Sequence, residues 1–144
     1  MLFRSIAPAF VRFDTPHSDT PRTQLLSNGR VMSMVTNAGG GFTRWGDFDL
    51  TRWRADTTRD QWGSFCYLRD RESGELWSNA FHPTRKTVES YSATLAPERA
   101  ELSLRHEGIH SRTTVFVSPG DDVEFRRITL TNQSDRPRHI ELTS

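Results

Sequence analysis

The feature that most constrains the fold is an alternation of apolar and polar residues along the second half of the chain. Ala100, Leu102 and Leu104 alternate with polar residues, and similar runs occur around 91–95, 114–117 and 140–142. This period places alternate side chains on opposite faces of an extended strand. Turn residues separate the runs at spacings of about 8–12 residues, and no segment has convincing helical periodicity. We therefore expect an all-β fold, an antiparallel sandwich or barrel, and favour the β-sandwich.

Shorter apolar runs predict further strands. They are expected at residues 31–35, 63–68 and 76–78, with a polar hairpin turn at 69–75. In the later run 123–130, Phe125 and Ile128 fall on opposite faces, which breaks the apolar pattern. We predict a β-bulge at Arg126 and Arg127, because one extra residue would restore a single apolar face.

The length of 144 residues fits one domain with a modest core. Residues 1–24 include a polar segment bounded by prolines, and we interpret them as an N-terminal arm or linker. Residues 25–144 are expected to form the β-sandwich domain. We expect no membrane insertion by this chain, because no stretch approaches the roughly 18 apolar residues of a membrane span.

Charge and cysteine content narrow the function classes. The net charge of +1 argues against nucleic-acid binding through phosphate neutralisation. Cys66, the single cysteine, cannot form an internal disulfide and is expected to be a buried thiol. One cysteine fits a reducing compartment, and we expect a cytoplasmic location.

One stretch, residues 37–62, combines glycine, tryptophan, arginine and aspartate. It opens with Gly39, Gly40 and Gly41 and holds three of the four tryptophans of the chain. Glycines here allow positive φ and close approach of another group, but no lysine or helix follows to make a phosphate-binding loop. Aromatic faces mixed with guanidinium groups and carboxylates suit a sugar-binding surface. The alternative is a structural arginine–aspartate network that ties two loops together.

Under the sugar-binding interpretation, the arginines donate to hydroxyls, Trp45 and Trp53 stack on sugar rings, and Asp47 accepts. The candidate substrate-binding residues are Arg44, Trp45, Asp47, Arg52, Trp53, Arg54 and Trp62. The same stretch also carries Arg59, Asp49, Asp56 and Asp60. We single out no catalytic residue, because nothing marks one carboxylate above the others.

A second motif, residues 106–110, has the zinc-protease pattern HExxH. That pattern binds zinc on a helix, where the two histidines lie one turn apart on one face. Here it lies between two alternating runs, and Gly108 stands where a hairpin must turn. We expect a hairpin tip and no metal or other cofactor, and keep a metal-dependent hydrolase using His106, Glu107 and His110 as a rival hypothesis.

An ordered succession of motifs resembles the N-terminal β-domain of the cellobiose phosphorylase and cyclic β-1,2-glucan synthase family, which is similar to glycoside hydrolase family 94. The resemblance extends from about Pro21 to Ser144. The segments that carry it are 25–30, 37–45, 51–54, 60–64, 68–70, 74–78, 118–127, 130–134 and 140–144.

This resemblance implies a supersandwich, similar to galactose-mutarotase-like folds, ahead of a helical (α/α)₆ barrel. In the family, the barrel holds the catalytic acid and the phosphate site. The enzymes are glycosyltransferases and phosphorylases that make or cleave β-glucosidic bonds by inverting phosphorolysis. In the synthases, the module belongs to an inner-membrane protein and is linked to control of glucan chain length. No residue here matches a catalytic position, so no catalytic residue is carried over.

The resemblance predicts a carbohydrate-binding accessory domain that is not catalytic alone. The implied partners are a β-glucan or gluco-oligosaccharide, a catalytic (α/α)₆ barrel, and a second copy of the chain. Self-association is expected because half a supersandwich exposes sheet edges and apolar faces. The rival hypothesis is a structural docking or oligomerisation module that binds no sugar, for which the three tryptophans would be buried in the free protein.

Overall fold

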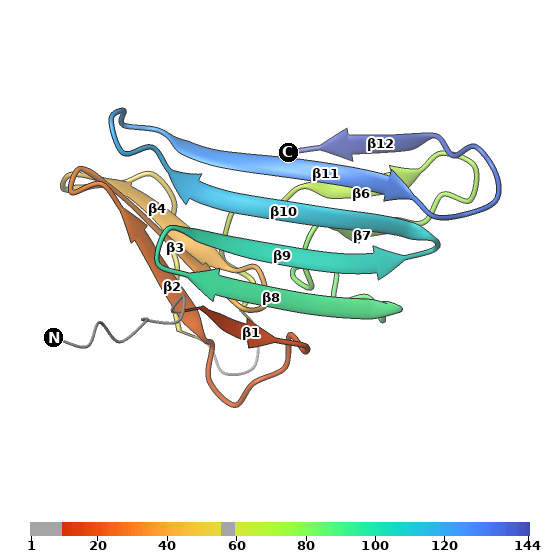
Figure 1. The fold of residues 1–144 in the computed structure, drawn as a ribbon, viewed down its shortest axis with the longest axis horizontal. Coiled ribbons are helices and arrows are strands. Elements are labelled where there is room, and N and C mark those ends of the chain that lie inside the picture. The colour runs from red at the N-terminus through yellow and green to blue at the C-terminus, as the bar shows by residue number, and fades with distance from the viewer. Residues whose placement is uncertain (1–9, 56–59) are drawn as a thin grey trace, which may run out of the picture.

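The computed structural model describes residues 10–55 and 60–144, and these residues form twelve β-strands (Figure 1). Residues 1–9 of the expected arm, and Asp56 and Arg59 of the stretch 37–62, lie outside the described residues. The strands are β1 (Val11–Phe13), β2 (Thr23–Ser27), β3 (Val31–Thr36), β4 (Gly41–Trp45), β5 (Phe48–Asp49), β6 (Tyr67–Asp70), β7 (Leu76–Ser78), β8 (Ser90–Ala96), β9 (Arg99–His106), β10 (Ile109–Val117), β11 (Glu124–Asn132) and β12 (Ile140–Thr143).

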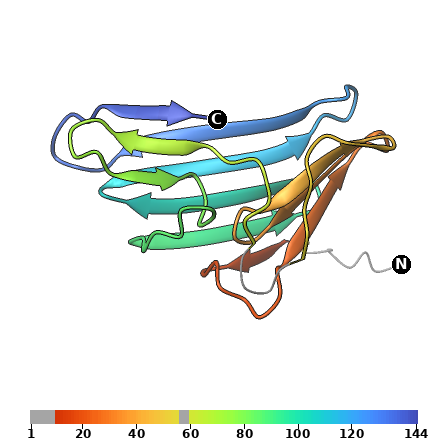
Figure 2. The same ribbon diagram turned by 180° about the vertical axis from the view of Figure 1, so that it is seen from behind.

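The strands form three antiparallel sheets. A five-stranded sheet has the order β1-β8-β9-β10-β11, a four-stranded sheet the order β2-β3-β4-β5, and a three-stranded sheet the order β12-β6-β7. Figure 2 shows the three-stranded sheet in front of one end of the five-stranded sheet, while β2, β3 and β4 cross its other end. The two smaller sheets thus cover one face of the larger one, and the predicted all-β sandwich is confirmed.

The core lies between these layers. Leu102 and Leu104 on β9 are almost fully buried, as their alternation predicts. Leu68 and Trp77 reach the same cluster from the three-stranded sheet, and Leu26 reaches it from the four-stranded sheet. One continuous cluster therefore joins all three sheets, and burial of its apolar side chains is the main favourable term in folding.

Most of the predicted strands are present. The run 31–35 forms β3, residues 76–78 form β7 after the expected turn, and the alternating runs form β8, β9, β10 and β12. The run 63–68 is strand only from Tyr67 onward. Cys66 is buried, as expected, and burial raises the pKa of its thiol.

The β-bulge predicted at Arg126 and Arg127 is wrong. β11 pairs with β10 in unbroken register from Val117–Glu124 to Ile109–Asn132. Phe125 lies on the outer face of the sheet, where it stacks on Phe116 with ring centroids 5.0 Å apart. Because this aromatic pair stabilises the outward position, the strand does not need an extra residue to turn Phe125 inward.

Part of the segment expected as an arm belongs to the sheet. β1 pairs with β8 through Val11–Leu95 and Phe13–Ala93, and Phe13 packs against the core. The stretch after Gly41, which carries no strand in the sequence-based prediction, forms the hairpin of β4 and β5. The domain boundary at residue 24 stays a prediction.

Candidate functional site

The glycine triplet closes the start of the candidate stretch. Gly39 and Gly41 have φ values of 94° and 153°, which favour glycine. The amide of Gly41 donates to the carbonyl of Trp62 at 2.8 Å, and a Cβ on Gly40 would collide with the carboxylate of Asp60. The triplet therefore serves the two purposes predicted for it, which are positive φ and close approach of other groups.

Four of the seven predicted site residues line one surface cavity of about 240 Å³. Arg44, Arg52, Trp53 and Arg54 surround it together with Phe42, Asp49 and Thr51. We call it the arginine cavity. Its arginines are exposed and Trp53 is half-buried, so the groups predicted to contact a sugar are accessible to solvent.

A cross-strand ion pair fixes one wall of the arginine cavity. Arg44 on β4 lies opposite Asp49 on β5, and its Nε donates to Asp49 Oδ1 at 2.6 Å. This hydrogen bond lowers the pKa of Asp49 and raises that of Arg44. Among the described residues, Asp49 is the one carboxylate that lines the cavity beside three guanidinium groups, and these described groups together carry net positive charge.

The indole of Trp53 is held by a hydrogen bond to a buried carboxylate. Its Nε1 donates to Oδ1 of the buried Asp60 at 2.7 Å, and Thr36 Oγ1 donates to the other carboxylate oxygen. Gly40 donates its amide to the same threonine hydroxyl at 2.9 Å. The glycine triplet thus fixes Asp60, and Asp60 in turn fixes the orientation of Trp53.

The other three predicted residues lie outside the arginine cavity. Trp45 stacks on Phe48 and donates its indole N–H at 2.7 Å to Asp122 in the β10–β11 turn. The pKa of Asp122 is lowered by this hydrogen bond and by a second one from Arg30. Asp47 is exposed in the β4–β5 turn, and Trp62 is exposed without lining the cavity. A structural network of arginine, aspartate and tryptophan therefore forms around Trp45, but its charged members, Arg30 and Asp122, lie outside the stretch 37–62.

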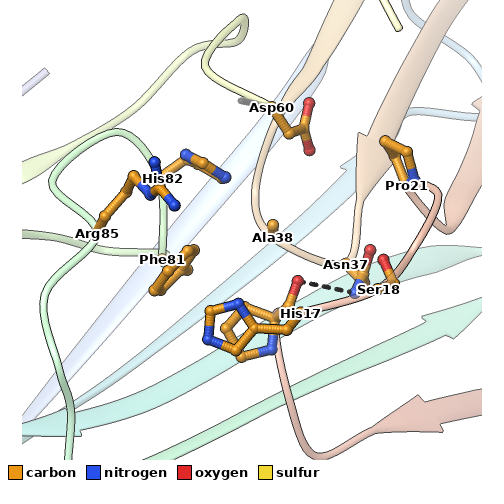
Figure 3. Close-up of a pocket in the computed structure, with 10 residues that line it drawn as sticks. His17, Ser18, Pro21, Asn37, Ala38, Asp60, Phe81, His82 and Arg85 are labelled. Atoms are coloured by element: carbon orange, nitrogen blue, oxygen red, sulfur yellow. Dashed lines mark hydrogen bonds between the residues drawn. The ribbon is translucent and has the colours of Figure 1, made fainter. Parts of the chain in front are cut away.

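A second cavity, of about 190 Å³, has Asp60 in its lining (Figure 3). Its side chains come from the β1–β2 segment, the turn after β3, Asp60 itself, and the segment between β7 and β8. We call it the histidine cavity, because His17 and His82 both line it. Sequence reasoning did not find it, because no local pattern links four segments so far apart.

The HExxH motif forms the predicted hairpin tip, since His106 pairs with Ile109 across a two-residue turn at Glu107 and Gly108. His106 points into the core, where it contacts Trp77 and hydrogen-bonds Glu75 at 3.1 Å. His110 pairs with Arg105 on the opposite face and hydrogen-bonds Ser103 at 2.7 Å. The two histidines cannot share a metal ion, because the sheet lies between them.

The fold defines the chain as an all-β domain, a layered sandwich with cavities between its loops that are lined by charged and polar side chains. The model of the family described as "Glycosyl hydrolase 94, supersandwich domain" matches residues 7–144, and the chain belongs to this family. The resemblance inferred from the sequence motifs is thereby confirmed.

Curated relatives carry the same domain. The chain is 34% identical over 131 residues to the cyclic beta-(1,2)-glucan synthase NdvB of Rhizobium meliloti (strain 1021), covering 91% of this chain and 5% of that protein. It is 28% identical over 134 residues to the N,N'-diacetylchitobiose phosphorylase of Vibrio proteolyticus, covering 90% of this chain and 17% of that enzyme. It is 33% identical over 135 residues to the solabiose phosphorylase of Paenibacillus borealis, covering 88% of this chain and 17% of that enzyme.

The chain spans at most about a sixth of the length of these three relatives. Among residues 10–55 and 60–144, no helix is long and apolar enough to cross a membrane.

Proposed function

We propose that the chain is a carbohydrate-contacting accessory domain of a β-glucan phosphorylase or cyclic β-1,2-glucan synthase-type enzyme, without catalysis of its own. It works beside a catalytic (α/α)₆ barrel. We place the enzyme in the cytoplasm, either as a separate protein or as the cytoplasmic part of an inner-membrane synthase. The relatives named above are a synthase and phosphorylases of glycosidic bonds, which supports a saccharide as the ligand.

The arginine cavity is the observation that carries this proposal. Arg44, Arg52 and Arg54 present guanidinium donors around Trp53, whose ring is fixed by Asp60. Sugar hydroxyls accept hydrogen bonds from such donors, and the C–H face of a pyranose packs against an indole. Trp45 and Trp62 are 45% and 40% exposed, so the tryptophans of this stretch are not all buried in the free protein.

Tryptophan fluorescence tests the proposal directly. We expect a saturable change when β-1,2-gluco-oligosaccharides are added, with cellobiose and laminaribiose as linkage controls. Arg52→Ala should weaken binding about tenfold, as expected for the loss of one hydrogen bond from a charged group. Arg71→Ala is the matched control, because Arg71 is an exposed arginine in the β6–β7 turn and does not line the cavity. An unchanged spectrum with every glucan at millimolar concentration would contradict the proposal.

A structural docking module is the second candidate function. It is favoured by the internal use of the Trp45 indole N–H and by the exposed apolar side chains beside it, Phe48 and Leu50. Such a group of exposed apolar residues suits a contact with the barrel or with a second copy of the chain. In that case glucan titrations would be flat for the unmodified chain and for Arg52→Ala alike. Phe48→Ser would weaken binding to the barrel domain.

A further inference from the structure

The histidine cavity is a separate feature from the arginine cavity. Asp60 lines the histidine cavity, of about 190 Å³, and is linked to the arginine cavity only through its hydrogen bond from Trp53. A neighbouring cavity of about 590 Å³ shares Pro16, His17, Phe81 and Arg85 with it. The two cavities therefore adjoin each other at the β1–β2 segment and the β7–β8 segment.

Asp60 supplies the negative charge of this cavity. The residue is 6% exposed, and its carboxylate accepts hydrogen bonds from Thr36 and Trp53. Each carboxylate oxygen can accept two hydrogen bonds, so with respect to the described residues both oxygens retain a lone pair for a further donor. A buried carboxylate with unused acceptor capacity favours a ligand that can donate to it.

His82 supplies a fixed imidazole. Its amide donates to Ala38 at 3.1 Å and its carbonyl accepts from the Ser78 hydroxyl at 2.7 Å, so both sides of its backbone are held. Its side chain is buried, and Nδ1 has no hydrogen-bond partner among the described residues. Burial lowers the pKa of His82, so the ring is neutral at pH 7 and has one acceptor and one donor nitrogen.

Arg85 supplies the positive charge. Its φ of 53° lies in the left-handed region, and its amide donates to Phe81 at 2.8 Å, which closes a tight turn. Its guanidinium is exposed and forms no ion pair within residues 10–55 and 60–144. Figure 3 shows Arg85, His82 and Phe81 on one side of the cavity and Asn37, Ser18 and Pro21 on the other.

These charges select the kind of ligand. A phosphate or carboxylate bound here would lie near the like charge of Asp60, and an ammonium group would lie near the like charge of Arg85. Either ion is therefore repelled in a partly desolvated site. A neutral ligand with several hydroxyls meets no such charge, and its hydroxyls can donate to Asp60 and accept from Arg85. The edge-to-face pair of His17 and Phe81, with centroids 4.9 Å apart, adds an apolar contact for ring C–H groups.

We propose that the histidine cavity binds one neutral sugar unit, with the rest of a short saccharide lying in the neighbouring cavity. The volume of about 190 Å³ is below the range of pockets that hold drug-sized ligands, and it suits a single ring. This site is independent of the arginine cavity, so it does not require that the proposed sugar contact at Arg52 exists.

Nitrogen NMR of the histidine side chains of the full chain tests the proposal. We expect addition of β-1,2-linked glucobiose to shift the ring-nitrogen resonances of His82, while those of His139, which lies at the distant β11–β12 loop, stay unchanged. Arg85→Gln should weaken this response at least fivefold, because the variant loses a charged donor and, within the described residues, no other side-chain hydrogen bond or ion pair. Arg127→Gln, an exposed arginine on β11, is the matched control and should titrate like the unmodified chain.

The results of this titration either support or overturn a sugar site in the histidine cavity. Loss of the His82 response in Asp60→Asn and Arg85→Gln, with circular dichroism unchanged, supports the sugar site. Inorganic phosphate that shifts His82 and is displaced by no sugar would overturn it in favour of an anion site. No shift of His82 with glucobiose at about 20 mM, well above a millimolar Kd, would also overturn it. Arg52→Ala separates the two proposals, because it should weaken binding at the arginine cavity about tenfold and leave the His82 response intact.

Discussion

At the scale of single residues, Gly40 is the position where the smallest change has the clearest predicted effect. A Cβ added there would overlap the carboxylate of Asp60, which holds Trp53 and lines the histidine cavity. We expect Gly40→Ala to destabilise the fold by about 1–3 kcal/mol, because a buried group must shift to make room. The emission maximum of the tryptophans should move as the Trp53 hydrogen bond is lost.

Gly120→Ala is the matched control for this substitution. No heavy atom lies within 4 Å of a Cβ built on Gly120, so the added methyl group meets open space. Chemical denaturation of the two variants makes the comparison. Equal unfolding free energies for Gly40→Ala and the unmodified chain would show that Asp60 can move without cost, and that Gly40 does not fix it.

The candidate site shows where prediction from single residues ends. The triplet indicates close approach of another group, but it does not reveal that the group is Asp60. Arg44, Arg52, Trp53 and Arg54 lie close along the chain, and the fold brings them to one cavity. His82 and Arg85 were not predicted, because the cavity that they line with Asp60 forms only after four separate segments have packed together.

At the scale of elements, Arg138, just before β12, joins the chain there to β6 by an ion pair and to the β9–β10 turn by a hydrogen bond. Arg138 donates through Nε to Asp70 Oδ2 at 2.8 Å and through a terminal nitrogen to the carbonyl of Glu107 at 2.7 Å. Asp70 is fully buried, and it also accepts the amide of Glu72 at 2.8 Å. These backbone and arginine hydrogen bonds lower the pKa of Asp70.

The sign of the acid dependence follows from this lowered pKa. The folded state favours the ionised carboxylate, so its contribution to stability is present above the unfolded-state pKa of about 4 and is lost as the pH falls through the lower folded-state pKa. Asp70→Asn should therefore melt at a lower temperature than the unmodified chain at pH 7 and lose less further stability below about pH 4. Thermal melts at pH 7, 4 and 3 measure this, with Asp135→Asn in the exposed β11–β12 loop as the control. Parallel pH profiles for Asp70→Asn and the unmodified chain would contradict it.

Strands were predicted correctly where burial of one face alone decides which residues are apolar. β8 and β9 alternate cleanly because one face packs on the core and the other faces solvent. The prediction failed on β11, where Phe125 lies on the outer face against Phe116, a cross-strand partner that the sequence of one strand cannot reveal. It also gave no strand for β4 and β5, because the residues after Gly41 are rich in arginine and aspartate.

At the scale of the whole molecule, the described sheets end in open edges on one side. β11 is the last strand of the five-stranded sheet and β12 the last of the three-stranded sheet, and the two lie along the same side in Figure 1. Phe125, Leu130 and Leu142 are all more than a third exposed on these strands. A long edge strand with exposed apolar side chains is a template for pairing with another chain.

We therefore expect this side of the molecule to associate, either with another domain or with a second copy of the chain. Sedimentation velocity of the purified chain between about 5 and 500 µM should give a sedimentation coefficient that rises with concentration, as mass action requires. Leu142→Lys should suppress the rise, since an exposed lysine on an edge strand opposes pairing. Leu25→Lys on β2 is the matched control, because Leu25 is 53% exposed on a different sheet, and it should leave the rise unchanged. A monomer at every concentration would mean that the β11 and β12 edges are protected by their own twist and charges and do not recruit a second copy.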